Sequence, residues 1–181
     1  MLYTRGGDDG MSGLFATAER FSKDHPIYHA LGTLDELNSF LGICRAHSPV
    51  DGKVDIAKEV GNVQECLFVI QAELAGAQKI LESVHIEHLE QTIEVLESFI
   101  EDRHAFVIPG STKLSALFDY ARTIARRAER AVVGVHAQRE LSAASRAYLN
   151  RISSLLYAIA RYFADEAGVS ELSPGYKKST L

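Results

Sequence analysis

Between residues 54 and 81, apolar side chains recur every three or four positions, and this feature limits the fold of the chain more than any other. The stripe consists of Val60, Val63, Leu67, Ile70, Leu74, Ala77 and Leu81. Such spacing places every member on one face of an α-helix. A helix of this kind must bury its apolar face against other elements, so the stripe predicts a helix inside a packed helical domain.

Four further stretches have the same periodicity, and no stretch has a convincing strand pattern. They cover about 32–47, 84–101, 113–140 and 143–168. Proline and glycine break the pattern at 48–52 and again at Pro109-Gly110-Ser111-Thr112. Ser83 and Ser142 precede two of the stretches and are plausible helix caps. Long helices joined by short connections predict an all-α, five-helix up-and-down bundle.

The length of 181 residues suits one domain. Residues 1–30 form an irregular, glycine-rich segment, residues 31–168 the bundle, and residues 169–181 a polar tail that we expect to be flexible. A net charge of −5 gives no electrostatic reason to expect nucleic acid or an anionic membrane as partner. With no apolar run of about 18 residues and no secretion signal, we expect a cytoplasmic protein in which Cys44 and Cys66 are buried free thiols.

The fourth helical stretch carries an unusually basic run, from Arg122 to Arg130. Helical geometry places Arg122, Arg126 and Glu129 on one face beside the apolar stripe, whereas Arg127 points away. A solvated basic face is one reading. The other is a site for a small anionic ligand, because arginines beside an apolar stripe need a partner to offset the cost of burial.

Two other helices offer polar groups near apolar faces. Asp35 and Asn38 share one side of the first helix, and an arginine–carboxylate pair is directional when it is bidentate. The fifth helix carries Asn150, Ser154 and Arg161 along a polar face. These residues are either plain surface positions or members of the same site.

The N-terminal segment Thr4-Arg5-Gly6-Gly7-Asp8-Asp9-Gly10 is rich in glycine. Glycines let successive backbone N–H groups converge on phosphate oxygens. The segment is not a Walker loop, because no Gly-Lys-Ser/Thr follows it. On composition alone, a flexible terminus explains it equally well. Glu82 and His85 match half of a di-iron motif without a second copy, so no metal held by protein side chains is expected.

In order along the chain, these segments resemble the PduO-type ATP:corrinoid adenosyltransferases. The resemblance rests on residues 4–10, Ser22-Lys23-Asp24, residues 32–39, residues 106–110, residues 121–130 and Tyr148-Leu149-Asn150-Arg151-Ile152-Ser153. The arginine run is the specific part of the match, and the glycine loop is not. The matches extend over nearly the whole chain.

The resemblance implies transfer of the 5′-deoxyadenosyl group of ATP to the cobalt(I) of a reduced corrinoid, with Mg²⁺ on the ATP phosphates. It implies a homotrimer with sites between subunits, and a cobalamin reductase or a cobalamin-dependent enzyme as a possible partner. Asp35 would pair with Arg122, and Phe106 and Asn38 would face the corrinoid. The implied ATP-binding residues are Thr4, Arg5, Gly6, Gly7, Asp8, Gly10, Lys23, Arg126, Glu129 and Asn150. Asp35, Phe106, Arg122 and Arg126 would be catalytic.

Five positions depart from the usual family pattern, namely Ile27, His29, Ser111, Asp119 and Ser154. They leave two alternatives open. One is a relative that binds ATP or a corrinoid as carrier or sensor without turnover. The other is a structural helical oligomer in which the arginines form salt bridges between subunits.

Overall fold

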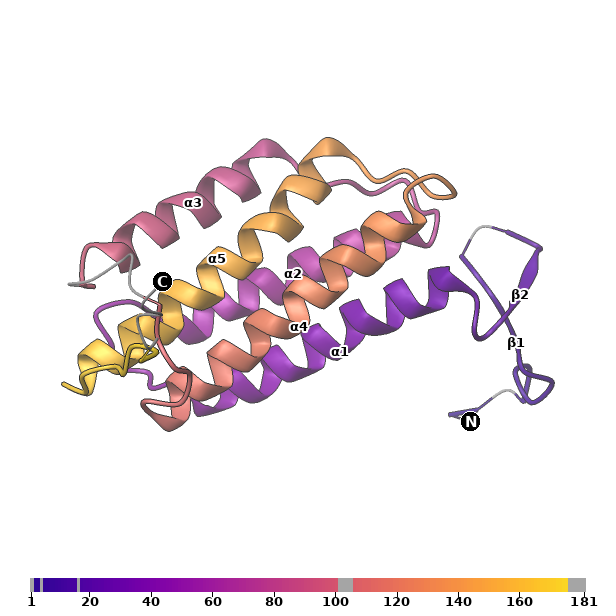
Figure 1. The fold of residues 1–181 in the computed structure, drawn as a ribbon. Helices are drawn as coiled ribbons and strands as arrows, with labels where there is room; N and C mark the ends of the chain where they lie inside the picture. Colours follow the sequence, from indigo (N-terminus) through magenta and orange to yellow (C-terminus); the bar gives the residue numbers. More distant parts are fainter. Residues whose placement is uncertain (1, 4, 16, 101–105, 176–181) are drawn as a thin grey trace, which may run out of the picture.

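The computed structural model describes residues 2–3, 5–15, 17–100 and 106–175. Within them the chain forms five helices and two short strands. These are β1 (Met11–Gly13), β2 (Arg20–Ser22), α1 (Pro26–His47), α2 (Ile56–Leu74), α3 (Ser83–Glu97), α4 (Lys113–Val135) and α5 (Ala143–Glu166). Successive helices run in opposite directions (Figure 1). The predicted all-α, five-helix up-and-down bundle is confirmed.

Helix α4 lies at the centre of the helix contacts, because it packs against both α1 and α5. Helix α2 packs mainly on α1, and α3 packs on α5 (Figure 1). The periodic apolar residues meet between the helices, as Leu34, Leu67, Phe118 and Ile152 show by their complete burial. This core fixes the register of α4 against α5, the two helices that carry the polar residues discussed below.

Two helix boundaries differ from the sequence expectation. Helix α1 begins at Pro26, inside the segment expected to be irregular, because proline fits the first helical turn and the His25 side chain accepts a hydrogen bond from the Ile27 N–H. Helix α2 ends at Leu74, although the apolar pattern continues to Leu81. The chain turns there at Gly76, whose φ of 103° favours glycine.

The N-terminal segment was expected to contain no strand, and the structure corrects this. Strands β1 and β2 pair antiparallel, with Ser12 opposite Phe21. Three-residue strands are too short to leave a period-two pattern in the sequence. The hairpin lies beyond the end of the bundle where α1 begins, opposite the end where the described chain finishes (Figure 1).

Two further observations concern the cysteines and the apolar character of the helices. Cys44 and Cys66 are buried and free, as predicted, and burial raises the pKa of the Cys44 thiol to about 12. Among the described residues, none of the helices combines the length and the apolar character needed to cross a bilayer.

Candidate functional site

A cavity of about 340 Å³ opens between α4 and α5. Arg122 and Arg126 reach it from α4, one helical turn apart, as their spacing predicted. Ser154, Tyr157 and Arg161 line it from α5. Glu97 adds one carboxylate from the end of α3. The cavity therefore combines three guanidinium groups and several hydroxyl groups with a single lining carboxylate, and this excess of cationic groups is suited to anionic ligands.

A buried ion-pair cluster forms the floor of this cavity. Arg161 Nη2 lies 2.5 Å from Asp119 Oδ2, and both side chains are only 3% exposed. Arg161 Nε lies 2.7 Å from Glu171 Oε2, and the guanidinium stacks 4.7 Å from the centre of the Tyr157 ring. The second oxygen of Asp119 lies 3.9 Å from Arg122 Nε. Asp119 thus links two arginines, one from each wall of the cavity.

The charges of this cluster balance. Burial by itself would lower the pKa of Arg161, but its interactions with Asp119, Tyr157 and Glu171 outweigh burial and leave the pKa above its usual value. Arg161 and Arg122 are therefore matched by two carboxylates. Arg126 is exposed, and no ion pair within the described part of the chain involves it. It is the cavity arginine whose charge is available to a ligand.

The pair of Asp35 with Arg122 that the resemblance implies is not among the contacts of the described residues. Asp35 is exposed on α1, whereas Arg122 takes Asp119, three residues earlier on its own helix, as its acidic neighbour. An acid–arginine pair does connect α1 with α4, but it joins Glu36 to Arg127 on the surface. Within one chain, the acid from the first helix holds a different arginine from the one predicted.

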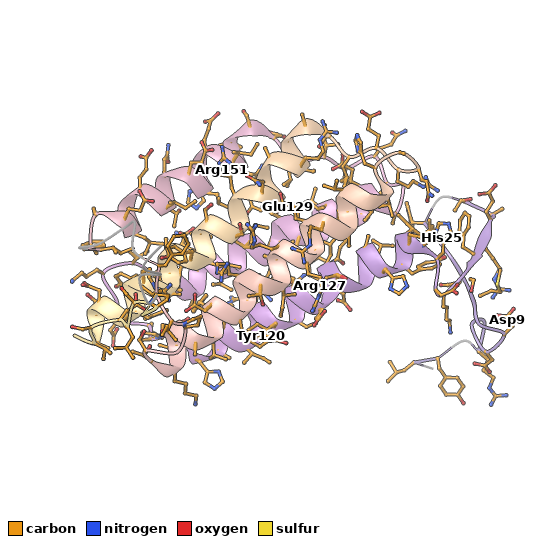
Figure 2. All side chains as sticks on the ribbon, in the orientation of Figure 1. Asp9, His25, Tyr120, Arg127, Glu129 and Arg151 are labelled. Atoms are coloured by element: carbon orange, nitrogen blue, oxygen red, sulfur yellow. The ribbon has the colours of Figure 1, made fainter. Side chains whose placement is uncertain are left out.

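Glu129 and Asn150 come together as two residues predicted to share a site. The Asn150 amide donates to Glu129 Oε1 over 2.8 Å and bridges α4 to α5. The side-chain oxygen of Asn150, Oδ1, in turn accepts a hydrogen bond from Arg151. Arg151 also pairs with Glu90 of α3 at 2.8 Å. Figure 2 shows Glu129 and Arg151 on adjacent helices above the middle of the bundle.

The N-terminal loop is held in shape by two basic side chains from the hairpin. Arg20 donates to both carboxylate oxygens of Asp9, each at 2.9 Å, and also to the Gly6 carbonyl. Lys23 donates to the Gly7 carbonyl at 2.6 Å. A Cβ on Gly7 would lie 2.9 Å from Lys23 Nζ, so the end of the Lys23 side chain would have to shift if Gly7 were replaced.

Two backbone positions in the loop adopt positive φ, Arg5 at 58° and Gly10 at 78°. Asp8 is exposed, with its N–H bonded to the Arg5 carbonyl. Thr4 lies outside the described residues. The loop is an ordered turn that is open to solvent, as a phosphate cradle would need to be.

The loop and the cavity do not meet within one chain. Figure 2 shows Asp9 at the far end of the molecule, beyond the start of α1, whereas Glu129 and Arg127 lie along the bundle. The residues predicted to bind ATP therefore fall into two groups. Arg5, Gly6, Gly7, Asp8, Gly10 and Lys23 form one, and Arg126, Glu129 and Asn150 form the other.

The two residues expected to face a corrinoid lie in different surroundings. Phe106 is 80% exposed in the loop before α4. Asn38 is buried between α1 and α2, where its carbonyl accepts from the Gln64 side chain at 3.0 Å. Asn38 thus faces α2 and not the α4–α5 cavity, and its corrinoid contact stays a prediction. Its burial follows from its neighbours in the helix, Leu34, Leu37 and Leu41.

Sequence reasoning missed the cluster of Asp119, Arg161 and Glu171. Asp119 was noted as a departure from the family pattern and Arg161 as a polar residue of the fifth helix. Nothing in the sequence indicated that they pair across 42 positions. Glu171 was assigned to a loose tail, yet it is tied to Arg161 and to Ser111. The available signal was that each charged residue has apolar neighbours in its own helix, with Phe118 before Asp119 and Tyr162 after Arg161. Among the described residues, no group of three or more His, Cys, Asp or Glu side chains could hold a metal ion.

Comparison with known proteins places this geometry in a family context. A family profile described as cobalamin adenosyltransferase matches residues 2–163. The corrinoid adenosyltransferase PduO of Salmonella typhimurium is 36% identical over 167 residues, which are 88% of this chain and 48% of that protein. A corrinoid adenosyltransferase of Bacillus subtilis is 34% identical over 185 residues, which are 99% of this chain and 94% of that protein. The chain thus spans about half the length of the PduO relatives and nearly all of the shorter ones.

Solved structures agree with the fold. A variant of the PduO-type ATP:corrinoid adenosyltransferase from Lactobacillus reuteri, complexed with cobalamin and ATP, superposes with a TM-score of 0.90 at 26% identity, covering 100% of both chains. Another variant of that protein, complexed with ATP, gives a TM-score of 0.87 at 27% identity over 97% of this chain and 100% of the other.

Proposed function

Because the chain belongs to the cobalamin adenosyltransferase family, we propose that it transfers the 5′-deoxyadenosyl group of ATP to the cobalt(I) of a reduced corrinoid. The cobalt(I) electron pair forms a bond to the 5′ carbon, the bond from that carbon to oxygen breaks, and triphosphate leaves with its electron pair. The nucleophile belongs to the corrinoid, so the protein needs no general base. Its tasks are alignment of the reacting atoms and neutralisation of the leaving group.

The distribution of charge in the cavity is the observation that carries this proposal. Arg122 and Arg161 are matched by the carboxylates of Asp119 and Glu171, and exposed Arg126 has a charge available to the triphosphate. Glu129 and Asn150, already joined by a hydrogen bond, would contact the nucleotide beside it. Mg²⁺ would accompany ATP through phosphate oxygens and water, as this ion usually does. Phe106 would lie against the corrin face and keep water from the lower side of the cobalt.

We propose that the complete ATP site forms between subunits of a homotrimer. The separation of the N-terminal loop, marked by Asp9, from Glu129 of α4 within one chain supports this (Figure 2). The loop of one subunit, with Lys23, would cover the cavity of its neighbour. Asp35, exposed on α1, would then find Arg122 across the same interface. We also propose that the protein acts in the cytoplasm and that its partner is a cobalamin reductase or a cobalamin-dependent enzyme.

The decisive activity test is an anaerobic assay with reduced cobalamin, ATP and Mg²⁺, followed by the absorption spectrum of the cobalamin. We expect the spectrum of adenosylcobalamin and release of one triphosphate for each adenosyl group transferred. Tight ATP binding without adenosylated product would instead favour the carrier or sensor alternative. That alternative is motivated by the departures at Ser111, Asp119 and Ser154. Ser111 and Asp119 are engaged in contacts around Arg161, and Ser154 lines the cavity.

Mixing two inactive variants tests the shared site. Lys23→Ala disables the loop and Arg126→Ala disables the cavity, so each homotrimer should lose most of its activity. Co-expressed subunits would form some interfaces in which both halves are intact, and activity should return. A double variant that carries both changes, co-expressed with an inactive single variant, is the control. If mixing restores nothing beyond this control, the site does not lie between subunits.

A further inference from the structure

The C-terminal segment after α5 is attached to the loop that precedes α4. The Ile108 N–H donates to the Leu172 carbonyl at 2.7 Å. The Ser111 hydroxyl donates to Glu171 Oε1, also at 2.7 Å. Residues 106–112 and 168–175 therefore form one unit at the end of the bundle, although about 60 positions separate Ser111 from Glu171.

Glu171 connects this unit to the floor of the cavity. Its second oxygen, Oε2, lies 2.7 Å from Arg161 Nε, and its side chain is 13% exposed. Arg161 cannot move freely, because it is buried and bonded to Asp119 of α4. One carboxylate thus joins a surface loop on one side to a fixed guanidinium on the other.

Phe106 depends on such an attachment more than a packed residue would. Its ring is largely exposed, so packing against the core does not set its position. Two hydrogen bonds are the described restraints nearest to it in the loop. One joins the Ile108 N–H to the Leu172 carbonyl, and the other joins the Ser111 hydroxyl to Glu171. A restraint on these two residues is therefore a restraint on the ring.

We propose that Glu171 is a positioning residue for Phe106, which it holds in place through Ser111 and through the pairing of Ile108 with Leu172. The proposal rests on the function proposed above, because that function is the reason to expect a corrinoid beside the Phe106 loop. Glu171 does not touch the reacting atoms. Its carboxylate sets how firmly the Phe106 loop is fastened to Arg161, and hence how well the corrinoid is seated.

The alternative is that Glu171 only balances the charge of buried Arg161. Three variants separate the two roles. Ser111→Ala removes the contact to the loop and leaves the pair with Arg161. Glu171→Gln retains an acceptor for Ser111 but loses the charge. Glu171→Ala removes both. Glu166→Ala is the matched control, because Glu166 makes an exposed pair with Lys53 at 2.6 Å on the end of α5.

Hydrogen–deuterium exchange of the peptide that covers residues 106–112 measures the attachment without any catalysis. We expect Glu171→Ala and Ser111→Ala to speed exchange at the Ile108 amide by about tenfold, in line with loss of a charge-assisted hydrogen bond. Glu171→Gln should give a smaller increase and Glu166→Ala none. Circular dichroism verifies that each variant is folded, and Glu171→Gln keeps the test valid if Glu171→Ala unfolds.

Steady-state kinetics then test the positioning role. In Ser111→Ala and Glu171→Ala, the KM for corrinoid should rise by about tenfold and the KM for ATP should stay within about twofold. Unchanged exchange in both variants overturns the proposal, and so does faster exchange with an unchanged KM for corrinoid. If the wild-type chain forms no adenosylated corrinoid, the proposed function fails and the positioning role fails with it. An active wild type with unaltered variants rejects the positioning role alone.

Discussion

Removal of the Asp119 carboxylate would leave the Arg161 guanidinium buried without its strongest partner. Both side chains are 3% exposed and their charged atoms lie 2.5 Å apart. Loss of one member of a buried ion pair costs about 3–5 kcal/mol, because the remaining charge has no access to water. Arg161 would keep Glu171 and the Tyr157 ring, so for Asp119→Ala we expect the lower end, about 3 kcal/mol.

The expected loss is large for a domain of this size. Small domains have free energies of unfolding of about 5–15 kcal/mol. For a chain of about 150–250 residues, 1 kcal/mol shifts the melting temperature by about 2–4 °C, so the expected drop is about 6–12 °C. Glu36→Ala is the control, because it breaks a carboxylate–arginine pair of the same kind that is about half exposed. That change should cost at most about 1 kcal/mol.

Urea unfolding at neutral pH, followed by circular dichroism, gives the free energy of unfolding of each variant. A double variant, Asp119→Leu with Arg161→Met, should recover part of the loss, because it removes both buried charges of the pair. Recovery stays partial because Glu171 then loses its partner Arg161. A loss below about 1 kcal/mol for Asp119→Ala would refute the reasoning. So would a double variant as unstable as the single one.

Three further predictions concern the proposed site and the loop. Arg126→Ala should lower kcat/KM for ATP by about 10- to 100-fold through loss of a charge-assisted contact. Arg130→Ala, at the exposed position directly after Glu129, should stay near wild type, and equal effects of the two changes in anaerobic kinetics would contradict this. Phe106→Ala should leave ATP affinity and stability nearly unchanged while turnover falls sharply, and unchanged turnover would remove Phe106 from the mechanism. Hydrogen bonds from Arg20 hold the pKa of Asp9 below its ordinary value of 3.8, so the hairpin should be stabilised above that pH and lose the contribution as pH falls through the lowered pKa. An NMR titration midpoint for Asp9 at or above 3.8 would disprove it.

The helices could be predicted from the sequence because burial leaves a periodic record. The stripe from Val60 to Leu74 is buried as expected. It also continues to Leu81, which is buried outside the helix, so periodicity alone could not locate the end of α2. Gly76 decides that end through a backbone conformation that other residues avoid. Local conformation can thus end a helix where the apolar pattern does not.

Periodicity alone could group site residues only where they share one helix. The common face of Arg122 and Arg126 follows from helical geometry, and both line the same cavity. Pairing between helices is a different problem. The choice of Asp119 over Asp35 near Arg122, or of Glu171 by Arg161, depends on how the helices and the C-terminal segment are packed, and no sequence period encodes that register.

Two arginines one turn apart in α4 are therefore not equivalent, and the difference comes from one carboxylate. Asp119 lies beside Arg122, whereas no ion pair among the described residues involves Arg126. A neutralised arginine can shape a cavity but adds little attraction for a polyanion, whereas an unmatched one attracts it strongly. Moving the acid from beside Arg122 to beside Arg126 should therefore change ATP affinity more than replacing either arginine with lysine.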